Sequence, residues 1–511
     1  MKFSELTRMS NHPRTSNRPA RLEEIGLLDF TGDKEADLSS PRYDSRDVKP
    51  GDAFFAIRGF ATDGHEYIKQ AIARGATTIV LEEASAFTSD DATSTNVNRI
   101  VVQNSRRALG LISEEAFGNP SEKLRMIGVT GTNGKTTVTH LIKQLLEANG
   151  EKTGIIGTVG IQIGDSQIEA THTTPESRDI SEMLARMVKE GVTTCVMEVS
   201  SHALALDRVF ALDYDIAAFT NITQDHLDFH HTMEEYFAAK RKLFDSLKDT
   251  AVAVTNADDP LGLAIVANSA ANSHSFGITN PADLVASDIQ LSIDRSEFVI
   301  QKRYSEEKAS VRSNLIGSFN VENVLAAMGA LYFGVPGYSL SVLADLMRNV
   351  GAVRGRFEAL PLTSGATAII DYAHTPDALE KVLTTIRALK PNGKITTVFG
   401  CGGDRDRLKR PQMGHIAAKL SDKVIVTSDN PRTEDSETII SEILQGIPPT
   451  MGSETTVEPD RSRAIEMAIS NVTADEIVLV AGKGHETYQV IGKEKHHFDD
   501  REEVTKYDNT R

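Results

Sequence analysis

The sequence lacks tryptophan altogether and contains only two cysteines, Cys195 and Cys401, among its 511 residues. Two distant cysteines cannot form the disulfide framework of a small secreted protein, and their scarcity favours a reducing compartment. No apolar run approaches the ~20 residues that a membrane-spanning helix requires. The first thirty residues lack the apolar block of a signal peptide. We therefore expect a soluble protein of the cytoplasm.

The sequence also lacks an excess of positive charge. Its 55 lysines and arginines are outnumbered by 72 aspartates and glutamates, which gives a formal net charge of −17. Nucleic-acid-binding proteins usually present a basic face, so this balance argues against a nucleic-acid partner. It does not argue against an anionic small molecule, because locally placed arginines, lysines and backbone N–H groups can bind one.

What is present is a long chain of globular composition, with 40% hydrophobic and 25% charged residues. Such a length exceeds one ordinary core. Strand-like and helix-like runs alternate along the chain, which predicts an α/β fold. We expect three domains: an N-terminal α/β domain at 1–122, a central P-loop ATPase-like domain with a parallel sheet at 123–353, and a C-terminal Rossmann-like domain at 354–511. Residues 1–20 are expected to form a loose extension.

Short apolar runs predict strands in all three domains, and longer runs with helical spacing predict helices. In the third domain each predicted strand runs into a polar or glycine-rich loop, and such loops line the ligand crevice of open parallel sheets. The predicted strands are 53–57, 77–81 and 100–102, then 126–129, 195–199, 216–220 and 252–255, then 368–371, 395–399, 424–427 and 477–480; the predicted helices include 67–74 and 135–149.

A glycine-rich segment between a strand and a helix is the strongest single motif. It reads Gly131-Thr132-Asn133-Gly134-Lys135-Thr136-Thr137. Glycines let backbone N–H groups surround phosphate oxygens, and the helix N-terminus adds positive potential. We expect Lys135 to reach the terminal phosphates and Thr136 to hold Mg²⁺. Val129 stands where the strict Walker pattern has glycine, and the alternative is a glycine-rich turn with an exposed lysine.

Two polar side chains follow predicted strands of the central domain. Glu198 ends one strand and could hold Mg²⁺, a hard ion that prefers oxygen ligands; its alternative is a solvated loop acid. His226 follows the next strand and could bind a second metal ion or cap local backbone.

Lys240 is unexpectedly placed. Thr232 and Glu235 form a capping box that begins a helix. Lys240 lies four residues from both Tyr236 and Phe244, within the apolar stripe of that helix. A lysine there must extend to solvent, pair with an acid or lose its charge, and burial lowers the pKa of a lysine.

These segments together resemble the Mur ligases of bacterial peptidoglycan synthesis, in order and spacing from about residue 44 to residue 486. The motifs that carry the resemblance are 131–136 and 198–202, Asp225-His226-Leu227-Asp228, Asn256-Ala257-Asp258-Asp259, Gly355-Arg356-Phe357-Glu358 and Asp371-Tyr372-Ala373-His374-Thr375-Pro376. The resemblance implies an enzyme that uses ATP to activate a carboxylate as an acyl phosphate, which an amine then attacks to form an amide.

The resemblance also implies roles for individual residues. The first domain would bind the UDP-linked substrate, with Ser45 near the UDP end. Catalytic roles fall to Lys135, Glu198, His226 and Lys240, with Mg²⁺ held by Thr136, Glu198, His226 and Lys240. The family carries a carbamylated lysine at the position of Lys240. The implied ATP-binding residues are Gly131, Thr132, Asn133, Gly134, Lys135, Thr136, Thr137, Asn256, Arg356 and Asp371, with ATP between the second and third domains. Thr173, Thr174, Ser200 and Arg208 would contact the muramoyl dipeptide.

Within the family the third domain resembles the members that add 2,6-diaminopimelate to the D-glutamate of UDP-N-acetylmuramoyl-L-alanyl-D-glutamate. The deciding segment is Asp429-Asn430-Pro431-Arg432, because a guanidinium suits the second carboxylate of diaminopimelate. Arg405, Gly482 and Glu486 occupy the other amino-acid-contacting positions, and Glu486 could pair the substrate's ammonium. Taken alone, 429–432 is a proline-containing turn. Residues 60–62 depart from the family pattern near the uridine.

Three other functions are alternatives to the addition of diaminopimelate. A lysine-adding relative and a folylpolyglutamate-synthase-like ligase share the reaction type, and a P-loop regulatory module would bind nucleotide without making amides. A dinucleotide-binding dehydrogenase is disfavoured, because residues 400–403 lack the third glycine of that motif. The resemblance implies ATP and Mg²⁺ as cofactors, small molecules as the only partners, no nucleic acid or membrane, and a monomer.

Overall fold

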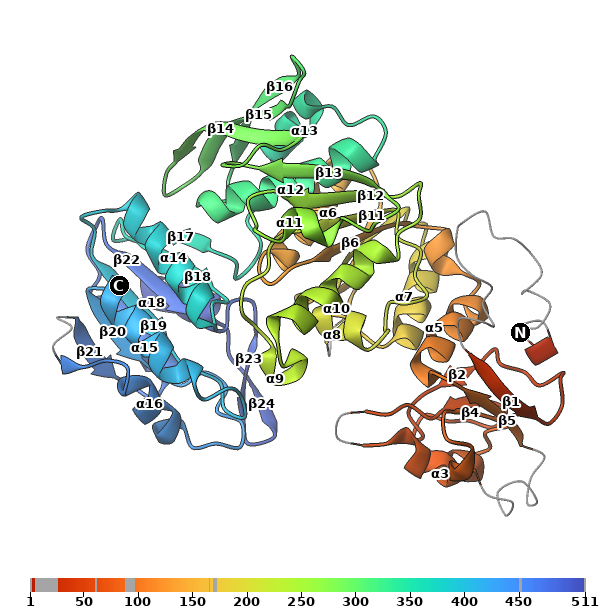
Figure 1. The fold of residues 1–511 in the computed structure, drawn as a ribbon. Coiled ribbons are helices and arrows are strands. Elements are labelled where there is room, and N and C mark those ends of the chain that lie inside the picture. Colours follow the sequence, from red (N-terminus) through yellow and green to blue (C-terminus); the bar gives the residue numbers. More distant parts are fainter. Residues whose placement is uncertain are drawn as a thin grey trace. The chain divides into compact units, whose positions relative to one another are not determined.

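The computed structural model describes residues 2–4, 26–59, 62–87, 97–164, 166–168, 172–449 and 453–509 (Figure 1). Most of the predicted extension at 1–20, and Phe60 and Ala61 near the predicted uridine site, lie outside these residues. The fold is α/β with three domains, each built on its own sheet, as predicted. The described helices include none that is both long and apolar enough to cross a membrane.

The chain forms two compact units. The first contains Met1–Val285, Gln301–Lys308 and Glu322–Leu346, and the second contains Ala286–Ile300, Ala309–Val321 and Met347–Arg511. The first two predicted domains therefore share one unit. The boundaries expected near residues 122 and 353 stay predictions.

The N-terminal sheet has five strands in the order β1-β5-β4-β3-β2. Only β1 is antiparallel to its neighbour. Apolar clusters cover both faces, and helices α3 and α5 contribute to them. The elements are β1 (Leu27–Thr31), β2 (Pro41–Arg42), β3 (Ala53–Phe55), β4 (Thr78–Leu81), β5 (Asn98–Val102), α3 (Ile68–Ala73), α5 (Ser105–Ala116) and short 3₁₀ helices at Gly64–Tyr67, Ala84–Ala86 and Pro120–Glu122.

The central sheet has eleven strands in the order β16-β15-β14-β13-β12-β11-β6-β10-β7-β8-β9. The strands from β13 to β7 are parallel. The strands are β6 (Arg125–Thr130), β7 (Thr153–Gly157), β8 (Gly160–Ile163), β9 (Ser166–Ile168), β10 (Thr194–Glu198), β11 (Ile216–Phe219), β12 (Val252–Asn256), β13 (Asn272–Gly277), β14 (Leu284–Leu291), β15 (Ser296–Lys302) and β16 (Lys308–Ser313). The register places Glu198 beside Val129, so β10 ends next to the start of the glycine-rich loop.

Helices α7, α8 and α10 contribute buried side chains to one large apolar cluster with the strands of this sheet, and α8 packs against α10 (Figure 1). Helix α12 approaches β11 closely, because a Cβ atom at Gly334 would lie 2.4 Å from Ile216 Cδ1. The helices are α6 (Lys135–Ala148), α7 (Ser177–Lys189), α8 (Ser201–Ala205), α9 (Leu227–His230), α10 (Met233–Asp245), α11 (Gly262–Ile265), α12 (Ser318–Gly334) and α13 (Leu340–Met347).

The C-terminal sheet has six strands in the order β17-β18-β22-β19-β20-β21, all parallel except β17. Helices α14, α15 and α16 pack on one face, with α14 beside α15, and α17 and α18 pack on the other (Figure 1). The elements are β17 (Glu358–Pro361), β18 (Thr367–Asp371), β19 (Ile395–Phe399), β20 (Lys423–Val426), β21 (Glu454–Val457), β22 (Ile477–Ala481), the hairpin β23 (Tyr488–Ile491) and β24 (Glu494–His497), α14 (Pro376–Leu389), α15 (Lys409–Leu420), α16 (Ser436–Leu444), α17 (Arg461–Ser470) and α18 (Asp500–Asn509).

A fully buried ion pair joins α17 to α18. Arg461 Nε and Nη2 each donate to a different carboxylate oxygen of Asp500, both at 2.8 Å, and both side chains are 0% exposed. Arg461 Nη2 also donates to the carbonyl oxygen of Ala481 at 3.0 Å. The pair therefore connects both helices to the carboxyl end of β22.

We predict that Asp500→Ala destabilises the second unit by about 3–5 kcal/mol, because it leaves the Arg461 guanidinium buried without its counter-charge. The free energy of opening is measured from hydrogen exchange in α17 and α18. Lys381→Ala is the control, since it removes an exposed Lys381–Asp377 pair on α14 that contributes about 0.5 kcal/mol at most. Equal effects of the two substitutions would contradict the prediction.

Candidate active site

The glycine-rich loop connects β6 to α6 in a conformation that two of its residues can adopt only as glycine. Gly131 has φ 153° and Gly134 has φ 88°. A Cβ atom at Gly131 would lie 1.9 Å from Thr220 Oγ1, and one at Gly134 would lie 2.4 Å from Asn323 Oδ1. The spacing of the two glycines is thus required by backbone geometry and by close neighbours.

The end of β11 holds the loop in place. The Thr220 hydroxyl donates to the carbonyl oxygen of Asn133 at 2.6 Å, and Asn221 Oδ1 accepts from the N–H of Asn133 at 3.0 Å. The hydroxyl of Thr132 lies 3.0 Å from that of Tyr236 on α10. The loop is therefore fixed by side chains from two elements that follow it in sequence.

Lys135, the first residue of α6, folds back over the loop. Its Nζ donates to the carbonyl oxygens of Gly131 and Thr132, both at 2.9 Å. The Lys135 ammonium therefore lies beside two backbone carbonyl oxygens of the loop, at a helix N-terminus where a phosphate would be bound. The alternative of a turn with an exposed lysine is wrong, because the half-buried side chain binds the loop itself.

Glu198 lies at the carboxyl end of β10 and is 1% exposed. Its Oε2 accepts from the Thr136 hydroxyl at 2.9 Å and from the Thr158 hydroxyl at 3.1 Å, and its Oε1 accepts from the N–H of Thr158 at 2.8 Å. The alternative of a solvated loop acid is therefore wrong. Thr158 follows β7 directly and had no signal in the sequence.

Lys240 is buried on α10, with 1% exposure, and its Nζ donates to the carbonyl oxygen of Gly131 at 2.7 Å. Its Nζ also lies 4.5 Å from the centroid of the Tyr236 ring. Burial, with a smaller contribution from the nearby Lys135 charge, holds the pKa of Lys240 well below its usual value. Extension to solvent is excluded. In the described part of the chain, no carboxylate accepts a hydrogen bond from this amine.

The predicted capping box is present in its first half: the Thr232 hydroxyl accepts from the N–H of Glu235 at 3.1 Å. It begins α10 and thereby sets which face of the helix carries Lys240. The prediction that Lys240 lies within the buried stripe is confirmed.

His226 precedes α9 with a left-handed φ of 53°, and its ring is the first in a row of three histidine rings that continues through His202 to His230. Its ring lies edge-on to that of His202 at 4.7 Å between centroids, and the His202 ring lies 5.6 Å from that of His230. Burial, followed by the neighbouring imidazoles, lowers the pKa of His230 to about 4, and burial, followed by the charge of His226, does the same for His202. Neutral imidazoles at physiological pH are the form that binds metal ions.

Over the described residues, no three His, Cys, Asp or Glu side chains form a group that could hold a metal ion. The predicted set of Thr136, Glu198, His226 and Lys240 contains only two side chains of those types, since Thr136 offers a hydroxyl and an unmodified lysine is not a ligand. The metal assignment stays a prediction.

Four of the five residues predicted to contact the UDP-linked substrate lie close to Glu198. The Thr174 hydroxyl donates to the carbonyl oxygen of Glu198 at 2.8 Å and accepts from the N–H of Ser200 at 3.1 Å. Arg208 Nη1 donates to the carbonyl oxygen of Thr174 at 3.1 Å. The hydroxyl of Thr173 lies 3.0 Å from that of Thr158, which itself donates to Glu198.

Ser45, the fifth of these residues, lies in a turn between β2 and β3 of the N-terminal domain. It is buried and donates to Gln70 Oε1 at 2.9 Å. The structure thus places it in the first unit but does not bring it to the Glu198 cluster. Its role stays a prediction.

The other residues predicted to bind ATP belong to different units. Asn256 is buried in the first unit, where its Nδ2 donates to the carbonyl oxygen of Thr220, next to the glycine-rich loop, at 2.9 Å. Arg356 and Asp371 belong to the second unit. Asp371 accepts from the N–H groups of Phe357 and Ala373 at 2.6 and 2.7 Å, and burial raises its pKa despite the nearby Arg356 charge.

The predicted amino-acid-binding residues of the second unit lie on three loops that meet at the carboxyl edge of its sheet. The carbonyl oxygen of Asn430 accepts from the N–H of Gly403 at 2.9 Å, and Arg432 Nη1 donates to the carbonyl oxygen of Gly403 at 2.7 Å. Asn430 Nδ2 donates to Glu486 Oε2 at 2.8 Å. Residues 429–432 form an extended loop after β20, in which Arg432 makes an isolated bridge to Ile491, so the alternative of a simple proline-containing turn is wrong.

Two further positions complete this group of loops. Gly482 has φ 114°, and a Cβ atom there would lie 2.7 Å from Asp429 Oδ2, so a side chain would displace the acid. Arg405 is more peripheral: its Nη1 donates to the carbonyl oxygen of Asp404 at 2.9 Å. Pro431 is buried, and a Cβ atom at Gly403 would lie 1.9 Å from the carbonyl oxygen of Pro431.

Lys483 is the functional candidate that sequence reasoning missed. It is 0% exposed, and its Nζ donates to Asn430 Oδ1 and to Glu486 Oε2, both at 3.1 Å. Asp429 Oδ1 lies 3.7 Å away. A lysine between two glycines in 482–484 was the only sequence signal.

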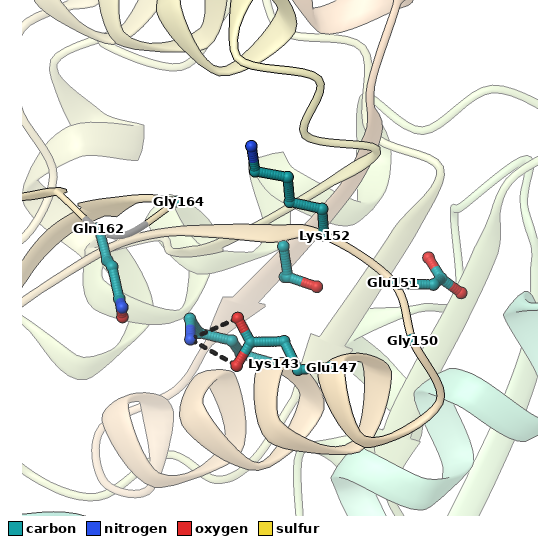
Figure 2. Close-up of a pocket in the computed structure, with 8 residues that line it drawn as sticks. Lys143, Glu147, Gly150, Glu151, Lys152, Gln162 and Gly164 are labelled. Carbon is teal, nitrogen blue, oxygen red and sulfur yellow. Dashed lines mark hydrogen bonds and ion pairs between the residues drawn. The ribbon is translucent and has the colours of Figure 1, made fainter.

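A cavity of about 460 Å³ lies in the first unit, at the end of α6 that is opposite to the glycine-rich loop. Figure 2 shows Lys143 paired with Glu147 and Lys152 pointing away from that pair. Lys143 donates to both carboxylate oxygens of Glu147 at 2.7 Å. Its charge is already matched, so this cavity is not the candidate active site.

Comparison with known proteins agrees with this geometry. Residues 40–116 match the Mur ligase family catalytic domain, residues 129–331 the Mur ligase middle domain, and residues 355–484 the Mur ligase glutamate ligase domain. The UDP-N-acetylmuramoyl-L-alanyl-D-glutamate–2,6-diaminopimelate ligase of Bacillus cereus is 43% identical over 91% of this chain and 93% of its own. The enzyme of that name from Clostridioides difficile is 42% identical over 94% and 97%.

Solved structures extend the similarity to the whole fold. A structure of UDP-N-acetylmuramoyl-L-alanyl-D-glutamate–2,6-diaminopimelate ligase superimposes with a TM-score of 0.69 at 32% identity, covering 100% of this chain and 99% of that one. The MurF ligase of Thermotoga maritima in complex with ADP shares the fold, with a TM-score of 0.60 at 20% identity over 92% and 97% of the chains. The chain belongs to the Mur ligase family.

We predict that Lys240→Met stabilises the unligated protein in CO₂-free buffer, by on the order of a few kcal/mol at pH 7, because folding forces this lysine to lose its proton or bury its charge. Since the pKa of Lys240 is lowered on folding, the cost is absent above about 10.4, the value in an unfolded chain, and increases as the pH falls below it, so it is larger at pH 7 than at pH 9. Denaturant unfolding at pH 7 and pH 9 measures the difference.

Lys143→Met on α6 is the matched control, since Lys143 is paired with an acid and gives no such gain. A Lys240→Met protein that is less stable than the wild type at pH 7 would show that this lysine is a structural residue.

Proposed function

We propose that this Mur ligase uses ATP to join meso-2,6-diaminopimelate to the D-glutamate of UDP-N-acetylmuramoyl-L-alanyl-D-glutamate, in peptidoglycan precursor synthesis. The observation that carries the proposal is the convergence of Lys135 and the buried amine of Lys240 on one carbonyl oxygen of the glycine-rich loop, with Glu198 bound to the adjacent Thr136. This arrangement offers positive charge and backbone donors to a phosphate, and a carboxylate to its counter-ion.

The chemistry of the reaction follows from these groups. A carboxylate oxygen of the D-glutamate attacks the terminal phosphorus of ATP, the bond to the ADP oxygen breaks, and an acyl phosphate forms. A neutral amine then attacks the acyl carbon, the bond to the phosphate oxygen breaks, and the amine loses a proton. Lys135 and the backbone N–H groups at the N-terminus of α6 neutralise the charge that spreads over the transferred group.

The donor set fits Mg²⁺. Glu198 and Thr136 supply a carboxylate and a hydroxyl 2.9 Å apart, and oxygen ligands of this kind suit a hard ion. Held by these two side chains, Mg²⁺ would supply positive charge that neutralises the phosphates. His226, with its neutral ring, is the further ligand that we assign to this site.

A carbamate on Lys240 would complete the set. A neutral amine adds to CO₂, forming an N–C bond and releasing a proton, and the product carries an anionic carboxylate. The lowered pKa of Lys240 supports this step, because it keeps the amine neutral and nucleophilic. The carbamate would also place a negative charge beside the ammonium of Lys135.

The substrates are assigned to the residues that lie around each centre. Thr173, Thr174, Ser200 and Arg208 would contact the muramoyl dipeptide, and Ser45 the UDP end. Asn256, Arg356 and Asp371 would complete the ATP site.

The amino acid is assigned to the second unit. Arg432 and Arg405 would bind carboxylate, and Asp429, Asn430 and Glu486 would bind ammonium. The names of the relatives support diaminopimelate as the amino acid. We further propose a cytoplasmic monomer that acts on small molecules alone and so contributes to cell shape and division.

Purified protein given ATP, the UDP-muramoyl dipeptide and diaminopimelate should release phosphate only when all three are present. Lysine in place of diaminopimelate should reduce kcat/KM by at least about 100-fold, because it leaves a carboxylate-binding guanidinium unpaired. Lys135→Ala should lower ADP formation by about 1,000-fold or more, as expected when a main charge in phosphoryl transfer is lost. Lys143→Ala on the same helix is the control.

Two outcomes would contradict the proposal. Phosphate release without any amino acid would favour a P-loop regulatory module with ATPase activity. Turnover with folyl substrates and glutamate would favour the folylpolyglutamate-synthase-like reaction.

Lys240→Ala should be inactive and should recover part of its activity with added acetate or formate, because a small carboxylate can replace the carbamate. The measurement is turnover against carboxylate concentration. Lys242→Ala, on the same helix but partly exposed, should neither lose activity nor respond to carboxylate. Full activity of Lys240→Ala without rescue would remove the carbamate from the proposal.

A further inference from the structure

Lys483 is a buried cation that the reaction described above does not use. It lies in the loop after β22, and its fully buried side chain is directed into the group of loops that holds Asp429, Asn430 and Glu486. Burying an ammonium is costly unless its charge and hydrogen bonds are matched. Two hydrogen bonds and two nearby carboxylates match it here.

The backbone around Lys483 fixes its direction. Gly484 has φ 54°, and a Cβ atom there would lie 2.7 Å from both the carbonyl oxygen of Gly355 and Tyr372 Cβ. Gly482 on the other side has φ 114° and a similar conflict with Asp429. Lys483 therefore lies between two positions that accept no side chain, and the backbone conformation fixes the direction of the Lys483 side chain.

Lys483 orients both polar neighbours at once. Asn430 Oδ1 accepts from Lys483 Nζ at 3.1 Å and from the N–H of Val490 at 2.9 Å, and these two donors turn the Asn430 amide so that Nδ2 donates to Glu486 Oε2 at 2.8 Å. Glu486 Oε2 thus accepts from both Asn430 and Lys483. Glu486 Oε1 has no hydrogen-bond partner within the described part of the chain.

The ionised side chains of Asp429, Glu486 and Lys483 sum to one negative charge, which one further cation would balance. Asp429 and Glu486 carry two negative charges when ionised, and Lys483 supplies one positive charge. Burial, and then the charge of Asp429, raises the pKa of Glu486, whereas Lys483 and its hydrogen bond lower it. Lys483 thus favours the ionised form of Glu486, the form that can bind an ammonium.

We propose that Lys483 is a positioning residue for the amino-acid substrate: it holds Asn430 and Glu486 so that the free Glu486 oxygen binds the ammonium of diaminopimelate that does not react. This inference rests on the proposed function. The reacting amine must be neutral to attack, and pairing with a carboxylate would favour its protonated form. The other amino group does not react, so it can stay protonated and pair with a carboxylate.

The test compares diaminopimelate with 2-aminopimelate, which keeps both carboxylates and one amine but lacks the second. In Lys483→Met we expect KM for diaminopimelate to rise about tenfold or more, as for loss of a charged hydrogen-bonding group. The preference in kcat/KM for diaminopimelate over 2-aminopimelate should fall by a similar factor. KM for ATP should change by less than about twofold, because its assigned residues remain.

Lys495→Met is the matched control. Both lysines approach the Tyr488 ring, Lys495 at 4.2 Å and Lys483 at 5.8 Å, but Lys495 is exposed on β24. It should leave both the KM values and the preference unchanged.

A double variant keeps the test decisive if Lys483→Met folds poorly. Lys483→Met with Glu486→Gln removes one charge of each sign, and its preference for diaminopimelate should equal that of Glu486→Gln alone, because Lys483 acts through Glu486. Independent, multiplying losses would overturn the inference, as would an unchanged preference in Lys483→Met. Absence of turnover in the wild type would instead reject the proposed function.

Discussion

The carbonyl oxygen of Gly131 accepts hydrogen bonds from two lysines, Lys135 at 2.9 Å and Lys240 at 2.7 Å, and the rest of the active site depends on this meeting. Two ammonium groups cannot share one acceptor without mutual repulsion, so at least one of them is disposed to lose its proton or to bind an anion. Burial on α10 selects Lys240 for the first outcome. The helix N-terminus suits Lys135 for the second.

The sheet topology explains why these groups meet. β6, β10 and β11 are adjacent and parallel, so the loops that follow them lie at one edge, and each contributes one part: the glycine-rich loop, Glu198, and the segment that contains Thr220 and Asn221. The second unit repeats the principle, since the loops after β19, β20 and β22 bring Gly403, Asn430 and Glu486 together. Convergence of polar loops at the carboxyl edge of parallel strands is thus used twice in one chain.

Much of this was predictable from the sequence, because it depends on local patterns. The strand before Lys135, the cap at Thr232 and the placement of Lys240 in an apolar stripe follow from periodicity, and the strands lie within two residues of their predicted positions. Contacts between distant segments were not predictable: Lys483 meets Asn430 across 53 residues and Arg461 meets Asp500 across 39. The predicted domain boundary near residue 353 likewise could not show that 286–300 and 309–321 pack with the C-terminal unit.

Two buried lysines of this chain illustrate how surroundings decide the function of one side chain. Lys483 donates to a carboxylate and an amide and lies near a second acid, so its charge is matched and its position is fixed. Lys240 donates to a backbone carbonyl beside another lysine, and the nearest aromatic ring is a weak substitute for an acid. A matched cation can only orient its neighbours, whereas an unmatched amine becomes a nucleophile. Equal burial therefore supports the positioning role proposed for Lys483 in the second unit and the reactive role proposed for Lys240 in the first.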